Sequence, residues 1–468
     1  MACPSSAPPI TEGSLIDFSH DLLGGLLRLH REHGPIAMFR DPHAGQSVVA
    51  VFDPEHNRTV LSDVERFQAR FFAIRGPRRS SQRRVTCGLL AMNGPQHKRN
   101  RRLVKEPFGP KAIAGYRETI SELAEEESAR WTAGEPFDFN EAMIRYMLRV
   151  TSRLLFGLDE PALAYELGEQ VAEWVELNNR LGVGALVSND EFSAGYEGLL
   201  EFAERLEANV LRLIRSRRER PDSEAKDVLS LLVGAADEAG GLSDEELVGQ
   251  ACVLFAAAHM TTAHAFSWTS FLLAQHPAAM RSVVNAVREG SVDRAPSPRV
   301  PSLLIRVINE SMRVLPPSAY SVRVAAEPLR LGPLDLARGT PIVFTPLVTH
   351  RLPHVFPEPE RFDPDRWLSI HPTAYEYHPF GAGPRRCIGG PLAIEVLRTS
   401  LPVFLRDWRL RTPEGARVDV EVKSTMLNPL RGVPMIAERH PGDPATEPWP
   451  AAAPVTGNVR ELVDLPSA

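Results

Sequence analysis

The chain has 468 residues, 43% hydrophobic and 24% charged, with a formal net charge of −6. These values are ordinary for a soluble globular protein, and they point to neither a nucleic-acid partner nor an anionic membrane surface. The four cysteines lie far apart, which excludes a disulfide framework or zinc site and favours the cytoplasm. We also expect no signal peptide and no membrane span, because no suitable apolar run occurs.

The first part of the chain predicts a short helical and β region. Residues 1–13 form a Pro/Ser-rich lead that we expect to be disordered. Apolar residues at helical spacing predict a helix over Leu15 to His33. Residues 36–40 and 46–53 then predict a β-hairpin. Seven arginines follow between residues 66 and 86. A solvated basic loop is the simplest interpretation, and one or two arginines facing an anionic substrate or an acidic partner is the alternative.

The middle of the chain predicts helices almost throughout. A basic helix over residues 94–108 places His97 and Arg101 four residues apart on one face. Amphipathic runs continue to about residue 220, and residues 243–276 then predict a helix that begins with a capping box. This long helix is apolar on nearly every face, so it should run through the core.

The last part of the chain combines a helix, short strands and irregular coil. A helix ends at Pro316–Pro317, residues 329–350 predict short strands, and residues 356–367 predict a proline-rich coil. We expect residues 14–440 to form one domain. Residues 441–468 form a Pro/Ala-rich tail that we expect to add nothing to a core.

A glycine-rich loop over residues 377–390 contains the most informative motif, F-x-x-G-x-R-x-C-x-G, which ends in Cys387 and Gly389. Backbone N–H groups and the positive end of the following helix dipole should favour a thiolate at Cys387. A lone cysteine is more often a small buried apolar residue. Here, however, the glycines permit close approach, and Arg385 is suited to bind a carboxylate of a cofactor. The motif therefore favours a metal-ligating thiolate.

This loop closely resembles the heme-binding loop of the cytochrome P-450 superfamily, with every fixed position of that pattern present, and the resemblance covers roughly residues 20–440. It implies a mainly α fold with a smaller β region and a long central helix over the heme. The implied cofactor is heme b, with Cys387 as the proximal iron ligand. The other residues implied to bind the cofactor are His97, Arg101, Arg323, Phe380 and Arg385.

An E-x-x-R pair, Glu310 and Arg313, lies on the helix before Pro316. Such pairs are common on surface helices and mean little alone. In the superfamily, an arginine from a downstream P-E-R-F segment joins the pair. That segment is intact at Pro359 to Phe362, so the resemblance implies that Arg361 completes a structural triad that braces the loop of Cys387.

The long helix carries the segment implied to activate oxygen. The superfamily pattern is a small residue, Gly, any residue, an acid and Thr, which makes Thr261 the expected catalytic residue. A buried threonine more often bonds the carbonyl four residues back. The acid is replaced by Met260, and a thioether relays no protons. Water, His259 or His264 could replace the acid, or the reaction needs less proton delivery.

The expected substrate pocket combines several elements around this helix. It includes the segment 75–91 and five individual residues: Val253, Ala256, Ala257, Ser318 and Tyr320.

The resemblance implies a monooxygenase that uses dioxygen to hydroxylate a small organic substrate, most simply in secondary metabolism. A ferredoxin and its reductase are the implied electron donors. Met260 keeps open an atypical chemistry, such as oxidative C–C or C–N coupling or desaturation. A heme carrier or sensor without turnover, and a purely structural helical protein, are the alternatives from other classes.

Overall fold

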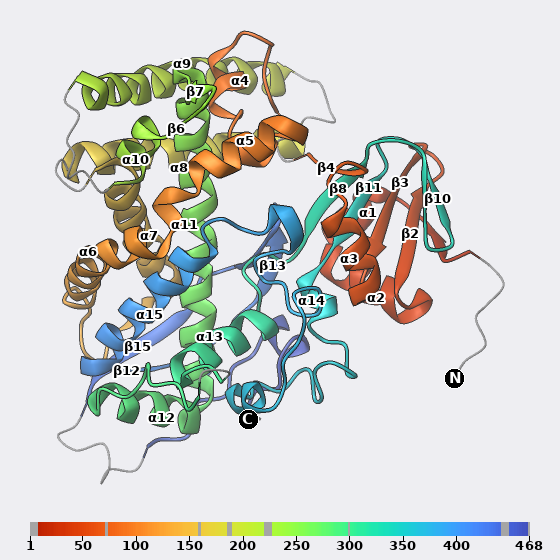
Figure 1. Ribbon diagram of the computed structural model, residues 1–468. Helices are drawn as coiled ribbons and strands as arrows, with labels where there is room; N and C mark the ends of the chain where they lie inside the picture. The colour runs from red at the N-terminus through yellow and green to blue at the C-terminus, as the bar shows by residue number, and fades with distance from the viewer. Residues whose placement is uncertain are drawn as a thin grey trace.

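The computed structural model describes residues 8–70, 74–157, 161–184, 190–219, 227–297, 300–440 and 449–466, without the side chains of 182–184 and 190–194. The described chain is mainly helical, with its largest sheet at one side of the helical region (Figure 1). Its helices are α1 (Leu15–His20), α2 (Leu22–His33), α3 (Pro54–Ser62), α4 (Ser81–Val85), α5 (Gly94–Val104), α6 (Pro110–Ser128), α7 (Phe139–Phe156), α8 (Pro161–Gly184), α9 (Asp190–Glu219), α10 (Val228–Gly234), α11 (Asp244–Gln275), α12 (Pro277–Arg288), α13 (Leu303–Val314), α14 (Pro346–Thr349) and α15 (Gly390–Asp407). None of these helices is both long and apolar enough to cross a membrane.

The largest sheet has the strand order β1-β2-β3-β11-β8-β4. These strands are β1 (Ile10–Glu12), β2 (Ile36–Asp41), β3 (Gln46–Val51), β4 (Phe67–Ala69), β8 (Ser321–Ala325) and β11 (Pro341–Phe344). The predicted hairpin is confirmed, because β2 and β3 pair antiparallel with Met38 opposite Val49. Within the lead that we expected to be disordered, residues 10–12 instead pair parallel with β2. Residues 1–7 of that lead lie outside the described residues.

The small sheets are β12-β15-β5, β13-β14, β9-β10 and β6-β7. Their strands are β5 (Pro136–Asp138), β6 (Ala236–Asp237), β7 (Gly240–Gly241), β9 (Leu329–Leu331), β10 (Leu334–Leu336), β12 (Trp408–Arg411), β13 (Val420–Lys423), β14 (Met426–Pro429) and β15 (Pro434–Arg439). Among the small sheets, β9-β10 packs beside the large sheet (Figure 1).

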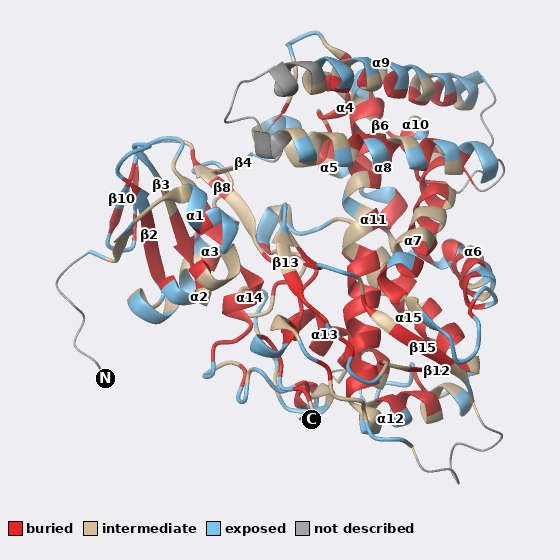
Figure 2. Cartoon of the chain, turned by 180° about the vertical axis from the view of Figure 1, so that it is seen from behind, coloured by how far each residue is buried: buried red, intermediate tan, exposed pale blue. Residues whose placement is uncertain are grey.

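Helix α11 forms the axis of the helical region, as expected. Ser243 caps its first turn, and the reciprocal bond from the Glu246 side chain completes the predicted capping box. At 1.5 Å per residue, its 32 residues span about 48 Å. It contacts α7, α4, α13, α9, α15 and α8, so its side chains are buried along most of its length (Figure 2). The helix therefore fixes the positions of the elements on either side of the site described below.

The expectation that the C-terminal tail adds nothing to the core is wrong for residues 449–466. Val455, Val459 and Leu462 are buried in the main hydrophobic cluster. The buried Arg351 guanidinium donates to the Leu462 carbonyl at 2.6 Å, which ties this segment to the chain near α14. The prediction was wrong because it was based on the high Pro and Ala content of the tail, which also contains a few large apolar side chains that pack in the core. Residues 441–448 of the tail lie outside the described residues.

Candidate active site

The loop that precedes α15 presents Cys387 on a tightly closed backbone. The Cys387 N–H donates to the Phe380 carbonyl at 2.8 Å, which closes the loop. Gly383 has a φ of +68°, and a Cβ there would lie 2.2 Å from the Leu61 carbonyl oxygen, so glycine is required. A Cβ at Gly389 would come within 4.0 Å of the Cys387 sulfur. The thiol side chain is thus accessible on one side, while protein groups lie close enough around the sulfur to desolvate it.

The protein surroundings alone do not favour a thiolate at Cys387, contrary to our expectation. Burial of the sulfur among protein groups raises its pKa. The N–H groups of Gly389 and Gly390 and the nearby Arg101 and Arg386 charges lower it, and they offset only part of the burial. A bound cation removes this penalty, because metal ligation deprotonates a thiol. The site therefore suits a metal-bound thiolate better than a free one.

Three arginines and one histidine, predicted from distant segments, gather beside this loop. His97 and Arg101 come from α5, Arg323 from β8 and Arg385 from the cysteine loop. Their charges act on one another: burial, followed by the Arg385, Arg101 and Arg323 charges, lowers the pKa of His97 to about 4. Burial first, and a neighbouring arginine second, lower the pKa of Arg323 and that of Arg385 to about 10. We call Arg101, Arg323 and Arg385 the inner arginines.

The inner arginines have no carboxylate partner among the described residues. Arg101 donates to the Arg386 carbonyl at 2.6 Å, and Arg323 donates to the Val322 carbonyl at 3.0 Å. Arg385 donates to the Met92 carbonyl and to Asn93 Oδ1, but its buried Nε has no partner. Clustered cations with spare donors are costly unless an anion joins them. The cluster therefore fits a group that carries carboxylates beside its metal, as a heme does.

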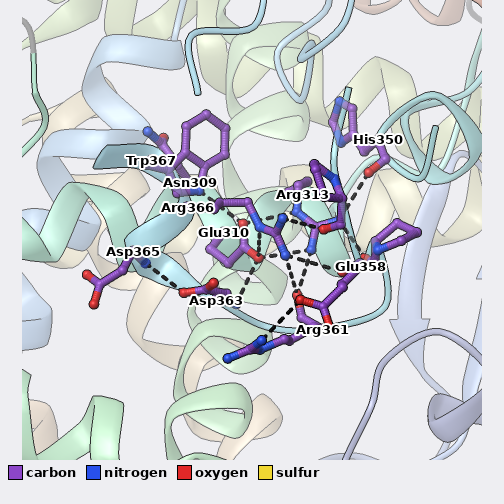
Figure 3. Close-up of polar contacts among 12 residues, drawn as sticks. Asn309, Glu310, Arg313, His350, Glu358, Arg361, Asp363, Asp365, Arg366 and Trp367 are labelled. Atoms are coloured by element: carbon purple, nitrogen blue, oxygen red, sulfur yellow. Dashed lines mark hydrogen bonds and ion pairs between the residues drawn. The ribbon is translucent and has the colours of Figure 1, made fainter. Parts of the chain in front are cut away.

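Glu310 lies at the centre of a buried polar network on α13 (Figure 3). Arg313 binds it with two bonds, from Nε at 3.0 Å and from Nη2 at 2.9 Å. It also accepts from the Asp363 N–H at 2.9 Å and from the Trp367 indole at 3.0 Å. Both Glu310 and Arg313 are fully buried, so the pair is a core feature and not a surface helix pair.

The second arginine on Glu310 is Arg366, and the prediction of Arg361 is wrong. Arg366 Nε donates to Glu310 Oε1 at 2.9 Å, whereas the exposed Arg361 side chain pairs with Glu358 at 3.1 Å (Figure 3). Arg361 contributes only its backbone carbonyl, which accepts from Arg313 and Arg366. The sequence contained the signal, because Pro-acid-Arg-aromatic occurs twice, at residues 359–362 and at 364–367.

This network connects to the cysteine loop through α14 and the start of the loop. Arg313 donates to the His350 carbonyl at 3.1 Å, and His350 Nε2 accepts from the His378 N–H at 2.9 Å. The Tyr377 hydroxyl donates to the Asn309 carbonyl on α13 at 2.9 Å. Burial lowers the pKa of His378 to about 4, so its ring stays neutral. The Glu310 network and the loop of Cys387 are thus one continuous hydrogen-bonded unit.

The predicted distal residues lie in the middle of α11. Ala257 is exposed, whereas Ala256, Met260 and Thr261 are half-buried, so this stretch faces open space within an otherwise buried helix. The Thr261 hydroxyl donates to the Ala257 carbonyl at 2.7 Å. This is the ordinary bond of a helical threonine, so the catalytic role of Thr261 stays a prediction.

The two histidines considered as proton relays differ in their partners. His259 Nε2 bonds the Ile144 carbonyl on α7 at 3.0 Å, so this histidine joins two helices. His264 is buried with an unpartnered Nδ1, and burial followed by the His259 charge lowers its pKa to about 4. Both rings are therefore neutral at neutral pH, and His264 is the one with a free ring nitrogen.

A cavity of about 320 Å³ opens between the large sheet, the cysteine loop and the β13–β14 turn. Among the predicted pocket residues, Tyr320 lines it, as does Leu90 from the segment 75–91. Ser318 is half-buried and donates to the Tyr320 carbonyl at 3.3 Å. Val253 is buried against Gly88, and a Cβ added at Gly88 would lie 2.6 Å from the Val253 side chain. The walls combine apolar side chains, hydroxyls and arginines: Ala69, Arg70, Leu90, Tyr320, Ser321, Val322, Arg323, Arg385, Ser424 and Thr425.

Comparisons with known proteins agree with this geometry. The sequence model described as Cytochrome P450 matches residues 4–433. Cyclooctatin synthase of Streptomyces melanosporofaciens is 32% identical over 386 residues, which cover 78% of this chain and 82% of that protein. Cyclooctat-9-en-7-ol 5-monooxygenase of the same organism is 31% identical over 339 residues, with 70% and 73% covered.

Solved structures resemble the whole described chain. CYP175A1 of Thermus thermophilus matches with a TM-score of 0.70 and 26% identity, covering 92% of this chain and 100% of that one. The retinoic acid-bound cyanobacterial CYP120A1 matches with a TM-score of 0.75 and 22% identity, covering 92% and 99%. The second likeness concerns the fold alone.

Proposed function

The chain belongs to the cytochrome P450 family and is a heme-iron monooxygenase, and from this premise we propose that it hydroxylates a small organic substrate of secondary metabolism. The observation that carries the proposal is the carboxylate-free cluster of Arg101, Arg323 and Arg385 beside the Cys387 thiol. The names of the two Streptomyces relatives support secondary metabolism as the setting.

In this proposal the cofactor is heme b, which has two carboxylates. The inner arginines and the neutral His97 bind those carboxylates, Phe380 packs beside the loop, and the Cys387 sulfur ligates the iron. Bound heme supplies the thiolate-supported redox chemistry that activates dioxygen. A position for a metal ligand must be held to a fraction of an ångström, and the Glu310 network holds the loop of Cys387 in place.

The distal residues exclude water and hold a proton in this proposal. The alanines of α11 leave space above the cofactor, and Thr261 carries the hydroxyl proton at Oγ1, now donated to the Ala257 carbonyl. Ala256, Ala257, Ser318 and Tyr320 line the space for the substrate in this proposal, whereas Val253, which is buried against Gly88, contributes only packing behind it. Electrons come from a redox partner, for which we propose a ferredoxin and its reductase. The supporting observation is that the four cysteines lie too far apart in sequence for the usual iron–sulfur spacings. The same cysteine usage supports a cytoplasmic location.

A carbon monoxide difference spectrum of the reduced protein tests the central assignment. We expect the red-shifted Soret band of a thiolate heme in the wild-type protein and in Cys252→Ala, a control that removes a different buried thiol. Cys387→Ser should lose the band. Retention of the band in Cys387→Ser would place the ligand elsewhere, and a wild-type protein without it would leave a structural role as the better account.

Met260 favours a second candidate, an atypical coupling or desaturation in which the substrate supplies protons. Replacing Met260 with Asp or Glu restores a titratable group on α11. If these Met260 variants still form a hydroxylated product and release less peroxide than the wild type, the proposal of hydroxylation is supported. A coupled or desaturated product in the wild-type protein would favour the second candidate. Wild-type protein with the band but without any product would favour a heme carrier or sensor.

A further inference from the structure

The arginine-rich segment between β4 and α4 contains arginines of different kinds. Arg66 at its start lies near two acidic residues, with Glu327 at 3.7 Å. Arg84 at its end binds Glu207 of α9 with two bonds, one of them 2.7 Å long. Arg84 joins the segment to α9, and carboxylates of the protein lie near both arginines and balance their charges.

Five other arginines of the segment have no carboxylate partner among the described residues. Apart from the exposed Arg78 and Arg79, they are Arg70, Arg75 and Arg83. We call these last three the outer arginines. Arg75 and Arg83 are half-buried, while Arg70 is exposed at the end of β4. Burial lowers the pKa of Arg75, and the charges of Arg83 and Arg70 lower it further, against the effect of Cys87. An arginine stays charged even so, and the three charges repel one another.

Of the three outer arginines, Arg70 is the one that lines the cavity. Arg70 lines the cavity of about 320 Å³ together with the inner residues Arg323 and Arg385. Because Arg323 and Arg385 bind the cofactor's carboxylates in the proposed function, the cofactor takes the part of this cavity beside them, and the part beside Arg70 and Leu90 is left for a small-molecule substrate. Leu90 and Val322 supply apolar wall, so the cavity offers an apolar body and a cationic edge.

The charge balance separates the two arginine groups. The two carboxylates of heme b are matched by the inner arginines, which already supply three positive charges, Arg101, Arg323 and Arg385. The cofactor therefore has no further carboxylate that could balance the positive charge of Arg70 or Arg75. The exposed Arg70 is solvated, and its charge gains free energy when an anion binds to it against the neighbouring apolar wall.

We propose that the substrate carries an anionic end group, a carboxylate or a phosphate, which Arg70 binds at the edge of the cavity while an apolar body lies against Leu90 and Val322. This inference rests on the proposed function, because it assigns a substrate class to the same pocket. It also gives the arginine-rich segment a role that a solvated loop would not have. Guanidinium groups suit both anions, since they bind either one with paired bonds.

Binding titrations that follow the heme spin state test the proposal, with dodecanoic acid, dodecyl phosphate and methyl dodecanoate as probes. We expect wild-type protein to bind the acid or the phosphate at least roughly tenfold more tightly than the uncharged ester, which is what one charge-assisted contact supplies. Arg70→Gln should weaken binding of the preferred anion by about tenfold and leave binding of the ester within about twofold of the wild type. Arg70→Lys should retain part of the preference.

The exposed Arg78 of the same segment provides the matched control, and Arg78→Gln should bind all three probes as the wild type does. Equal binding of acid, phosphate and ester by the wild type would overturn the proposal, as would an equal loss in Arg78→Gln. If Arg70→Gln leaves anion binding unchanged but slows reduction by a ferredoxin, the segment docks an acidic protein instead and the proposal is wrong. The carbon monoxide band, recorded for every variant, separates these outcomes from a failure to bind heme.

Discussion

Replacing Arg366 with methionine should destabilise the protein far more than the same change at Arg361. Arg366 is buried on Glu310 and also donates to the carbonyls of Pro357 and Glu358. Its loss leaves a fully buried carboxylate with one cation in place of two and leaves carbonyls without donors. Breaking a buried ion pair in this way costs about 3–5 kcal/mol. Since domains are stable by about 5–15 kcal/mol, Arg366→Met should remove a large part of the free energy of unfolding.

Arg361→Met is the matched control, because the side chains of Arg361 and Glu358 are 57% and 72% exposed. An exposed pair contributes about 0–1 kcal/mol, so this variant should unfold almost as the wild type does. Urea unfolding followed by circular dichroism measures both changes, and the thiolate-heme band reports whether the loop of Cys387 keeps its shape. A loss in Arg361→Met as large as that in Arg366→Met would refute the network described for Glu310.

Further variants test burial, titration and the link to the cysteine loop. Leu462→Ala should cost about 2–5 kcal/mol in urea unfolding, because Leu462 is 1% exposed, while Leu430→Ala at 48% exposure should cost little. His264 has a pKa of about 4, below its ordinary 6.5, so between these values the unfolded chain binds more protons and the free energy of unfolding falls as the pH drops. His264→Leu should therefore make stability less dependent on pH across this window, and an unchanged slope would contradict the burial of this ring. Tyr377→Phe removes the 2.9 Å bond to the Asn309 carbonyl and should cost about 1 kcal/mol of unfolding free energy, with a weaker thiolate-heme band.

The parts of the fold that the sequence predicts well are those fixed by neighbouring residues. The capping box at Ser243 and Glu246 depends on spacing within one helical turn, and the β2–β3 hairpin depends on two adjacent apolar runs. The turn before Cys387 likewise needs glycine at Gly383, where any Cβ would meet the Leu61 carbonyl. Local geometry leaves few alternatives at such places, so pattern and structure agree.

The errors arose where a choice depends on contacts between distant segments. Two copies of the same four-residue pattern contain Arg361 and Arg366, and only the path of the coil around Glu310 decides which side chain is buried. The Pro/Ala-rich composition of the tail does not predict that Leu462 packs against the core. The net effect on the pKa of Cys387 depends on burial, which outweighs the helix N–H groups that the sequence shows. Each error concerns a quantity that no single segment determines.

The two sides of the site differ in how firmly the protein defines them. On the cysteine side, every link from Glu310 through His350 to the loop is a hydrogen bond between buried groups, so a change at one link should disturb the thiol. On the α11 side, Met260 relays no proton and the ring of His259 is engaged with the Ile144 carbonyl. Burial keeps the His264 ring neutral at neutral pH, with one N–H donor and one acceptor nitrogen, and its Nδ1 has no hydrogen-bond partner. For the proton delivery that we propose at Thr261, the sources that remain on this side are water, the neutral ring of His264 and the substrate itself, because Met260 carries no proton to give.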